Sequence, residues 1–258
     1  MINKPVLGVI GGSGLYDFPA LENILDHRIS TPFGDPSSPI ITGELHGKTV
    51  AFLARHGIGH IFTPSEVNYR ANIYAMKSIG VERIISISAC GSLREDFSPG
   101  QIVVPDQIID FTHMRTRTFF GNGAVVHISA ANPFCPDLSE LTFQAVKDTG
   151  AIVHKNSTYL TIEGPRFSTK AESNLYREWG MSIIGMTASP EVFLAREAEI
   201  CYCTLAHVTD YDVWHTSEDP VTVEMVVKVL RDNTETAQNA VMNLVDKIPG
   251  SRTCGCTW

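Results

Sequence analysis

The sequence has no apolar run close to the roughly 20 residues that a membrane-spanning helix needs. Its first residues also lack the charged and apolar regions of a signal peptide. Basic residues are few, because 20 Lys and Arg stand against 28 Asp and Glu, for a net charge of -8. Duplex binding depends on many contacts from Lys and Arg to phosphates. We therefore expect a cytoplasmic protein that binds neither membranes nor nucleic acids.

Several sequence motifs of common catalytic classes are missing as well. The chain has no H-E-x-x-H zinc motif, no Gly-x-Ser-x-Gly hydrolase elbow and no P-loop. Cys254-Gly-Cys256 lacks the second pair of ligands that a structural zinc ion requires, so we expect no metal and no cofactor. The six cysteines are interpreted as thiols, although Cys254 and Cys256 are close enough in sequence to exchange or pair.

Length and patterning predict one α/β domain that spans residues 1–258. Short apolar runs alternate with helical periodicity, which is typical of a sheet with helices on both faces. The predicted strands are Val6–Ile10, Thr49–Leu53, Arg83–Ile87, Gln101–Val104, Ser157–Ile162, Ser182–Met186 and Ile200–Val208. The predicted helices are Ser65–Ser78, Asp137–Thr149, Thr169–Glu178, Pro190–Glu199 and Val221–Ile248, and Asp106–Pro136 is predicted to be a long loop.

Two carboxylates follow the last predicted strand, in the segment Thr209-Asp-Tyr-Asp-Val213. An unpaired carboxylate is costly to bury, so Asp210 and Asp212 need hydrogen-bond donors if they lie inside the fold. An adenine, which has an exocyclic amine beside a protonated N7, would supply such donors on one edge. An acidic loop in water is the alternative, because Asp is usually exposed.

Three other strand ends carry groups that favour an anion. Gly11-Gly-Ser-Gly14 offers amides and a hydroxyl, Arg55-His56-Gly57 offers a guanidinium, and Ser88-Ala89 offers a hydroxyl and amides. Each segment alone is also compatible with an ordinary tight turn. Because open α/β sheets bind ligands at the carboxyl ends of their strands, the three together predict an anion site. Cys90, between Ala and Gly, is interpreted as a buried apolar residue and not as a nucleophile.

Later segments add groups suited to a planar base. Phe167 follows Glu163-Gly-Pro at a bend, where an aromatic ring could stack on a base or fill the core. Met186 and Thr187 end another strand and provide a soft apolar surface and one more hydroxyl.

Together these segments resemble the 5'-methylthioadenosine phosphorylases, in the trimeric branch of the purine nucleoside phosphorylase family. The resemblance spans nearly the whole chain and is carried by Gly11-Gly-Ser-Gly, Thr31-Pro-Phe-Gly, Leu53-Ala-Arg-His-Gly, Pro64-Ser-Glu-Val-Asn-Tyr-Arg-Ala-Asn, Ser88-Ala-Cys-Gly-Ser-Leu-Arg-Glu, Glu163-Gly-Pro-Arg-Phe-Ser, Gly185-Met-Thr-Ala-Ser-Pro-Glu and Thr209-Asp-Tyr-Asp. It implies a three-layer α/β/α domain around a mixed, partly barrel-like sheet, assembled as a homotrimer or homohexamer.

The resemblance also assigns roles to residues of this sequence. It implies a phosphate site, with phosphate as co-substrate, formed by Ser13, Arg55, His56, Ser88, Ala89 and Thr187. It implies that Asp210 protonates purine N7, that Asp212 accepts from the 6-amino group, and that Phe167, Met186 and Tyr211 contact the nucleoside. His127 matches a residue that reaches a neighbouring subunit's site, and Ser168 and Val223 match positions that set specificity.

The activity implied is reversible phosphorolysis of 5'-methylthioadenosine to adenine and 5-methylthioribose 1-phosphate, a pentosyl transfer in purine and methionine salvage. Gly185 stands where animal members have Asn, Ser13 replaces the commoner Thr, and the chain stops at Trp258 without the longer tail of animal members. The Gly185 departure and the short tail leave open a broader purine nucleoside phosphorylase or a methylthioinosine phosphorylase. A non-catalytic nucleoside-binding module is a second alternative, from another class.

Overall fold

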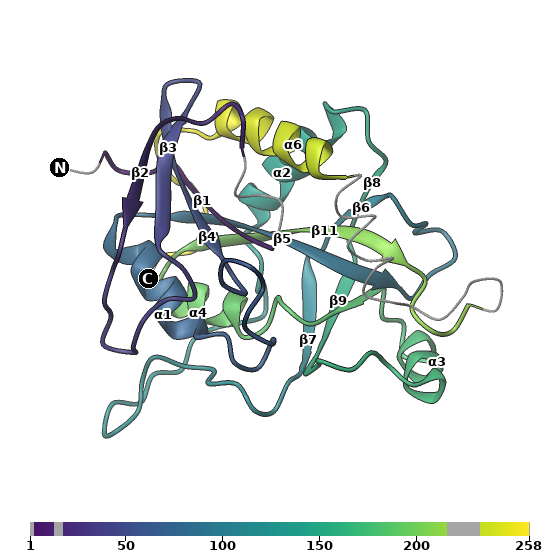
Figure 1. The fold of residues 1–258 in the computed structure, drawn as a ribbon. Coiled ribbons are helices and arrows are strands. Elements are labelled where there is room, and N and C mark those ends of the chain that lie inside the picture. The colour runs from purple at the N-terminus through teal and green to yellow at the C-terminus, as the bar shows by residue number, and fades with distance from the viewer. Residues whose placement is uncertain (1–2, 13–17, 216–232, 258) are drawn as a thin grey trace.

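The centre of the fold is a pair of long parallel strands, β5 (Arg83–Ser92) and β11 (Cys201–Asp210), shown in Figure 1. The structure is a computed structural model and describes residues 3–12, 18–215 and 233–257. All ten residues of β11 are buried. A strand that is covered on both faces must be largely apolar, which explains the continuous run from Cys201 to Val208.

The sheet is mixed and branches at β5. In the described part of the chain it has 11 strands, and the order along one path is β2-β3-β4-β1-β5-β10-β9-β7. On a second path β11 pairs with β5 and β6, and β6 pairs with β8. The remaining strands are β1 (Leu7–Gly11), β2 (Glu22–His27), β3 (Ile40–Leu45), β4 (Lys48–Ala54), β6 (Ile102–Val104), β7 (Gln107–Phe111), β8 (Val153–Lys155), β9 (Thr158–Ile162) and β10 (Ile183–Gly185).

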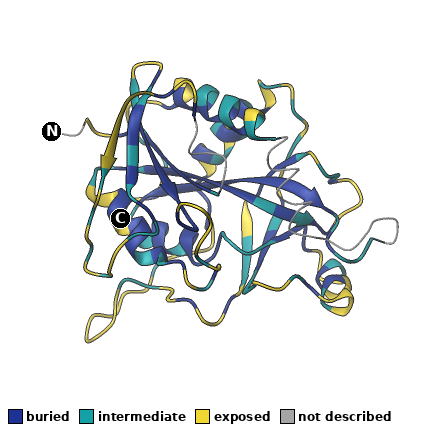
Figure 2. Cartoon of the chain, in the orientation of Figure 1, coloured by how far each residue is buried: buried dark blue, intermediate teal, exposed yellow. Residues whose placement is uncertain are grey.

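Helices cover both faces of the central strands, which confirms the predicted α/β fold with a mixed sheet. On one face α1 (Tyr69–Ser78) and α4 (Glu191–Glu197) pack together, and on the other α2 (Pro136–Lys147) packs with α6 (Thr234–Lys247). The helix α3 (Lys170–Glu178) lies apart from both pairs (Figure 1). Figure 2 shows that the buried residues are concentrated in the strands between these layers.

Side chains fix where several helices begin. Thr169 caps α3 in a reciprocal capping box with Glu172, as its predicted position suggests. The helix α1 begins only after Asn68, whose side chain accepts a hydrogen bond from the Ala71 amide. The predicted start at Ser65 is therefore wrong, and the Ser65 hydroxyl instead donates to the Glu163 carboxylate.

Other predicted elements agree with the structure apart from their ends. All seven predicted strands and the helices of the described residues are confirmed within a few positions. The predicted helix 221–248 is confirmed over Thr234–Lys247, and its first part lies outside the described residues. Strands β2, β3 and β8 were not predicted, and β7 lies inside the segment predicted as a loop. Among the described residues there is no helix with the length and apolarity to span a membrane.

We predict that buried His207 makes the fold sensitive to acid. Its side chain is 1% exposed on β11, and burial lowers its pKa to about 4 because the charged form is disfavoured. Below about pH 6.5 the histidine of the unfolded chain therefore binds a proton, whereas that of the folded chain does not. The free energy of unfolding is lost as pH falls from 6.5 towards 4. In His207→Leu the loss of unfolding free energy between pH 6.5 and pH 4 should be smaller by up to about 3 kcal/mol. Urea unfolding at several pH values in that range measures it.

The exposed His127 provides a matched control. His127→Leu should leave the dependence of unfolding free energy on pH unchanged. An equal dependence in the His207→Leu variant and the unaltered protein would contradict the role given to His207.

Candidate active site

The hydroxyls of Ser88 and Thr187 meet beside β5, which continues past the strand end predicted at Ser88-Ala89 as far as Ser92. The strand β10 runs antiparallel to β5, with Ile183 opposite Ser92 and Ile184 opposite Gly91, so Thr187 returns to the level of Ser88. Thr187 Oγ1 donates to Ser88 Oγ at 2.8 Å. The structure therefore brings together two of the hydroxyls predicted for the phosphate site, whereas Ser13 lies outside the described residues.

Tyr159 accounts for the glycine at position 185. A Cβ placed on Gly185 would lie 2.0 Å from the Tyr159 hydroxyl oxygen and 3.2 Å from the Ala89 carbonyl oxygen. That hydroxyl is 3.3 Å from Thr187 Oγ1, and the Tyr159 ring is fully buried. The space beside Gly185 is thus filled by a phenol, which adds a third hydroxyl to the pair formed by Ser88 and Thr187.

Arg55 forms a buried ion pair with Glu191 at the first turn of α4. Its Nε and Nη2 donate to the two carboxylate oxygens at 2.9 and 3.0 Å, and both side chains are at most 1% exposed. The guanidinium also donates to Ser86 Oγ at 2.6 Å and to the carbonyls of Ile10 and Ile87. Burial alone lowers the pKa of Arg55, but the attraction and hydrogen bonds of Glu191 outweigh it and raise the pKa. The phosphate-binding role of Arg55 stays a prediction.

His56 is buried beside Arg55 and is neutral. Its Nδ1 donates to the Phe62 carbonyl at 3.0 Å, and its ring stacks on His60 at 4.4 Å between centroids. Burial, together with the nearby charge of Arg55, lowers its pKa to about 3. Because Nδ1 carries the proton of the neutral ring, Nε2 is left as an acceptor.

Asp210 lies at an irregularity of the sheet. The pairing of β11 with β5 shifts between Val208 and Asp210, and such bulges redirect side chains. Its Oδ2 accepts from the Thr209 hydroxyl and its Oδ1 accepts from the Asp212 amide, both at 2.7 Å. The carboxylate packs on Gly91, where a Cβ would lie 2.9 Å from Oδ1. Asp210 is thus buried and hydrogen-bonded, which excludes the solvated acidic loop for this residue.

Asp212 is buried on a tight turn with a left-handed φ of 53°. Burial raises the pKa of its carboxyl, and the hydroxyls of Ser173 and Ser168 beside it only partly offset that effect. Within the described chain, Asp212 Oδ2 and the hydroxyls of Ser168 and Ser173 make no hydrogen bond of normal geometry. The two serine hydroxyls are its neighbouring donors, and a ligand amine would be a further donor to this buried carboxylate.

The other residues predicted to contact the nucleoside differ in their burial and in their partners. Phe167 and Met186 are half-buried, and the Met186 sulfur lies against Gly164, where a Cβ would be 2.5 Å away. The Tyr211 hydroxyl donates to Ser98 Oγ at 3.0 Å, and its predicted substrate contact stays a prediction. His127 is exposed on the long segment after β7, and Val223 lies outside the described residues.

Sequence reasoning missed Arg115, which organises the loops around Met186. Its fully buried guanidinium donates to the carbonyls of Met186, Ser189 and Glu163 at 2.6–2.8 Å and pairs with the Glu163 carboxylate at 3.1 Å. Although burial raises the pKa of Glu163, hydrogen bonds from Ser65 and from backbone amides lower it to about 2. No spacing in the sequence links Arg115 to these loops, so only the fold could reveal it.

A cavity of about 490 Å³ is lined by residues of β7, β9 and α3 and of the loops that follow β7 and β9. Its lining includes Ser168, one of the predicted site residues. A surface cavity of about 710 Å³ between Leu93–Asp96 and α3 contains none of the predicted site residues.

Comparison with known proteins identifies relatives over nearly the whole chain. The model of the phosphorylase superfamily matches residues 6–246. The S-methyl-5'-thioadenosine phosphorylase of Geobacter sulfurreducens is 53% identical over 254 residues, which cover 98% of this chain and 89% of that protein. A crystal structure of methylthioadenosine phosphorylase from an antarctic soil metagenomic library matches with a TM-score of 0.94 at 48% identity, covering 98% of this chain and 90% of that one.

A second solved structure is less similar in sequence and contains a bound ligand. Methylthioadenosine phosphorylase from Schistosoma mansoni, in complex with adenine, is 36% identical and has a TM-score of 0.92. The match covers 97% of this chain and 93% of that one.

We predict that Gly185→Ala destabilises the protein, because the added methyl group displaces the buried Tyr159 ring. Overpacking of this kind costs about 1–3 kcal/mol. In the double variant Gly185→Ala/Tyr159→Leu the smaller side chain makes room, so the two effects should be less than additive. Thermal unfolding measures both.

Gly250→Ala is the control, because a Cβ there meets no atom within 4 Å. Its melting temperature should stay close to that of the unaltered protein. Additive losses in the double variant would show that Tyr159 does not restrict position 185.

Proposed function

The chain belongs to the phosphorylase superfamily, and from this premise we propose that it catalyses reversible phosphorolysis of S-methyl-5'-thioadenosine to adenine and 5-methylthioribose 1-phosphate. The observation that carries the proposal is the 53% identity to an enzyme of that name across 98% of the chain. The buried Asp210 and the hydroxyl pair of Ser88 and Thr187 support it. The reaction transfers a pentosyl group and serves purine and methionine salvage.

Phosphate is the co-substrate, and no cofactor is needed for the transfer. An oxygen of phosphate attacks C1' of the ribose while the bond from C1' to N9 breaks and its electron pair moves into the purine. The hydroxyls of Ser88 and Thr187 and the Ala89 amide donate to the phosphate, together with Ser13 and Arg55. His56, neutral and with Nε2 as an acceptor, receives the hydrogen bond of a monohydrogen phosphate.

Asp210 acts as the acid at purine N7. In this structure both of its oxygens accept hydrogen bonds, which suits the ionised form. The Thr209 hydroxyl is also 3.2 Å from the Cys90 carbonyl. Rotation of that hydroxyl towards the Cys90 carbonyl would free Oδ2 of Asp210 to take up a proton from solvent, and the carboxyl then passes this proton to N7. A positioned acid of this kind contributes about 10²–10⁴ in rate.

Asp212 selects the base. Its buried Oδ2 accepts from the 6-amino group of adenine, in addition to the serine hydroxyls beside it. A 6-oxo purine would place lone pairs against the carboxylate, and such a mismatch costs orders of magnitude in rate. Phe167 and Met186 cover the nucleoside, and Ser168 lies at the edge of its pocket.

Two alternatives differ in observable ways. A broader purine nucleoside phosphorylase or a methylthioinosine phosphorylase would release hypoxanthine from inosine or methylthioinosine at a rate close to that for methylthioadenosine. A non-catalytic nucleoside-binding module would bind nucleoside without releasing purine.

We infer that the protein works in the cytoplasm as a homotrimer or homohexamer, in which His127 contacts the nucleoside of a neighbouring subunit. Two apolar residues beside it, Val125 and Val126, are 78% and 42% exposed. Exposed apolar side chains next to a site residue are suited to a subunit contact. Light scattering on the purified protein gives the subunit number.

We predict that Asp210→Asn slows phosphorolysis of methylthioadenosine by about 10²–10⁴, because the amide cannot donate the proton that N7 needs. Purine release should be measured with and without phosphate on methylthioadenosine, adenosine, inosine and methylthioinosine. The unaltered protein should prefer the 6-amino substrates and require phosphate.

The exposed Asp35 offers a matched control, and Asp35→Asn should keep full activity. Circular dichroism and the melting temperature show whether Asp210→Asn is folded. Turnover by a folded Asp210→Asn variant at the normal rate would remove Asp210 as the acid.

We predict different outcomes for two variants of the buried ion pair. Arg55→Met leaves Glu191 buried without its partner, so stability should fall by about 3–5 kcal/mol and the KM for phosphate should rise. Arg55→Met/Glu191→Met replaces both charges with apolar groups of similar volume and should recover stability. If Arg55 contacts phosphate, the high KM persists in the double variant.

A double variant with normal stability and a normal KM for phosphate would give Arg55 a purely structural role. The exposed pair formed by Lys155 and Glu140, at 3.0 Å, serves as a control. Replacing it should change stability by less than about 1 kcal/mol.

A further inference from the structure

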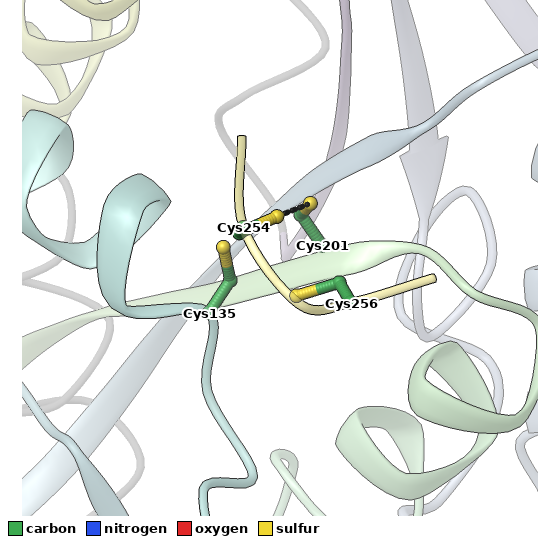
Figure 3. A group of neighbouring side chains, drawn as sticks. All are labelled: Cys135, Cys201, Cys254 and Cys256. Carbon is green, nitrogen blue, oxygen red and sulfur yellow. Dashed lines mark hydrogen bonds between the residues drawn. The ribbon is translucent and has the colours of Figure 1, made fainter. Parts of the chain in front are cut away.

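Four of the six cysteines gather in one cluster, shown in Figure 3. Cys135 precedes α2, Cys201 is the first residue of β11, and Cys254 and Cys256 lie on the tail that follows α6. Their four sulfur atoms all lie within 4.8 Å of one another. We expected Cys254-Gly-Cys256 to lack the second pair of ligands that a structural zinc ion requires. That expectation is wrong, because the fold places Cys135 and Cys201 beside these two cysteines.

The spacing of the sulfur atoms fits a shared ion. All six cysteines are free thiols, and Cys201 Sγ is 3.2 Å from Cys254 Sγ, well beyond the roughly 2.05 Å of a disulfide bond. Four sulfurs at about 2.3 Å from a tetrahedral zinc ion are separated by about 3.8 Å. A group in which every sulfur is near all three others matches that geometry more closely than two separate bonds would.

The surroundings of the cluster exclude water, and two neighbouring groups stabilise thiolates against the cost of burial. Cys135, Cys201 and Cys256 are at most 6% exposed and belong to the apolar core formed by α2, α6 and β11. The Leu138 amide in the first turn of α2 donates to Cys135 Sγ at 3.5 Å. Helix N-termini and nearby cations stabilise thiolates.

Arg252 supplies such a cation. Its guanidinium lies beside the Cys201 thiol and is anchored by a 2.7 Å hydrogen bond to the Glu199 carbonyl. A zinc ion with four thiolates carries two negative charges, and this guanidinium offsets one of them.

We propose that Cys135, Cys201, Cys254 and Cys256 bind one zinc ion as a closed tetrathiolate site. Each thiol gives up its proton to solvent when the ion binds, and no electron transfer is involved. Soft thiolate ligands select zinc among the common divalent ions, and four protein ligands leave no open position for catalysis. The site is therefore structural and ties the C-terminal tail to the start of α2 and of β11.

The test is the zinc content of the protein purified with a reductant and without a chelator, measured by mass spectrometry. About one zinc per chain is expected, and Cys254→Ser, which changes the half-buried ligand, should lose most of it. Cys203→Ser is the matched control, because Cys203 lies on the same strand as Cys201 but outside the cluster. Cobalt added to the metal-free protein should give the visible absorption of a tetrahedral thiolate site. This absorption should be absent in Cys254→Ser.

Titration of thiols in the unfolded protein, with a chelator and without a reductant, distinguishes a zinc site from a pair of disulfides. Six thiols are expected if the cluster holds zinc, since the sequence has six cysteines. Two thiols would show that the cluster forms two disulfides and would overturn the proposal. Six thiols with no zinc retained after zinc is added and the excess removed would overturn it as well.

Discussion

The ion pair between Arg55 and Glu191 is the constraint on which the rest of the site depends. Many polar residues are buried, but among the described residues only this pair places two opposite full charges at no more than 1% exposure. The guanidinium reaches the carbonyls of Ile10 and Ile87, and Tyr202 donates to the Glu191 carboxylate at 2.7 Å. One interaction therefore fixes the ends of β1, β4 and β5 relative to α4.

The predictable part of the fold is the part in which local pattern and tertiary environment agree. The strand Cys201–Asp210 is apolar throughout and buried throughout, so its sequence alone predicts it. The strand Glu22–His27 is exposed along nearly its whole length and pairs only with β3, so it carries no apolar alternation that a sequence could reveal. The start of α1 was misplaced because Ser65, a good helix cap in isolation, is occupied by Glu163 from a distant loop.

The candidate site shows the same division. Strand-end glycines and hydroxyls are visible in the sequence, and the structure brings Ser88 and Thr187 into contact as that pattern suggests. Partners from distant segments are not visible. Glu191 for Arg55, Tyr159 beside Gly185, and Arg115 under the Met186 loop all depend on the register of strands that lie far apart in the chain. The hydrogen bond from the Tyr211 hydroxyl to Ser98 likewise joins two segments that lie far apart in the chain.

The hydrogen bond between Thr187 and Ser88 bears on how easily the site exchanges its ligand. In this arrangement the Thr187 hydroxyl donates to Ser88, so one of the two donors already has a partner. An incoming anion then replaces one good hydrogen bond with another, and the net gain per contact stays modest. Such near-balanced exchange keeps substrates and products at comparable free energies on the protein, which is the condition that a catalyst running in both directions requires.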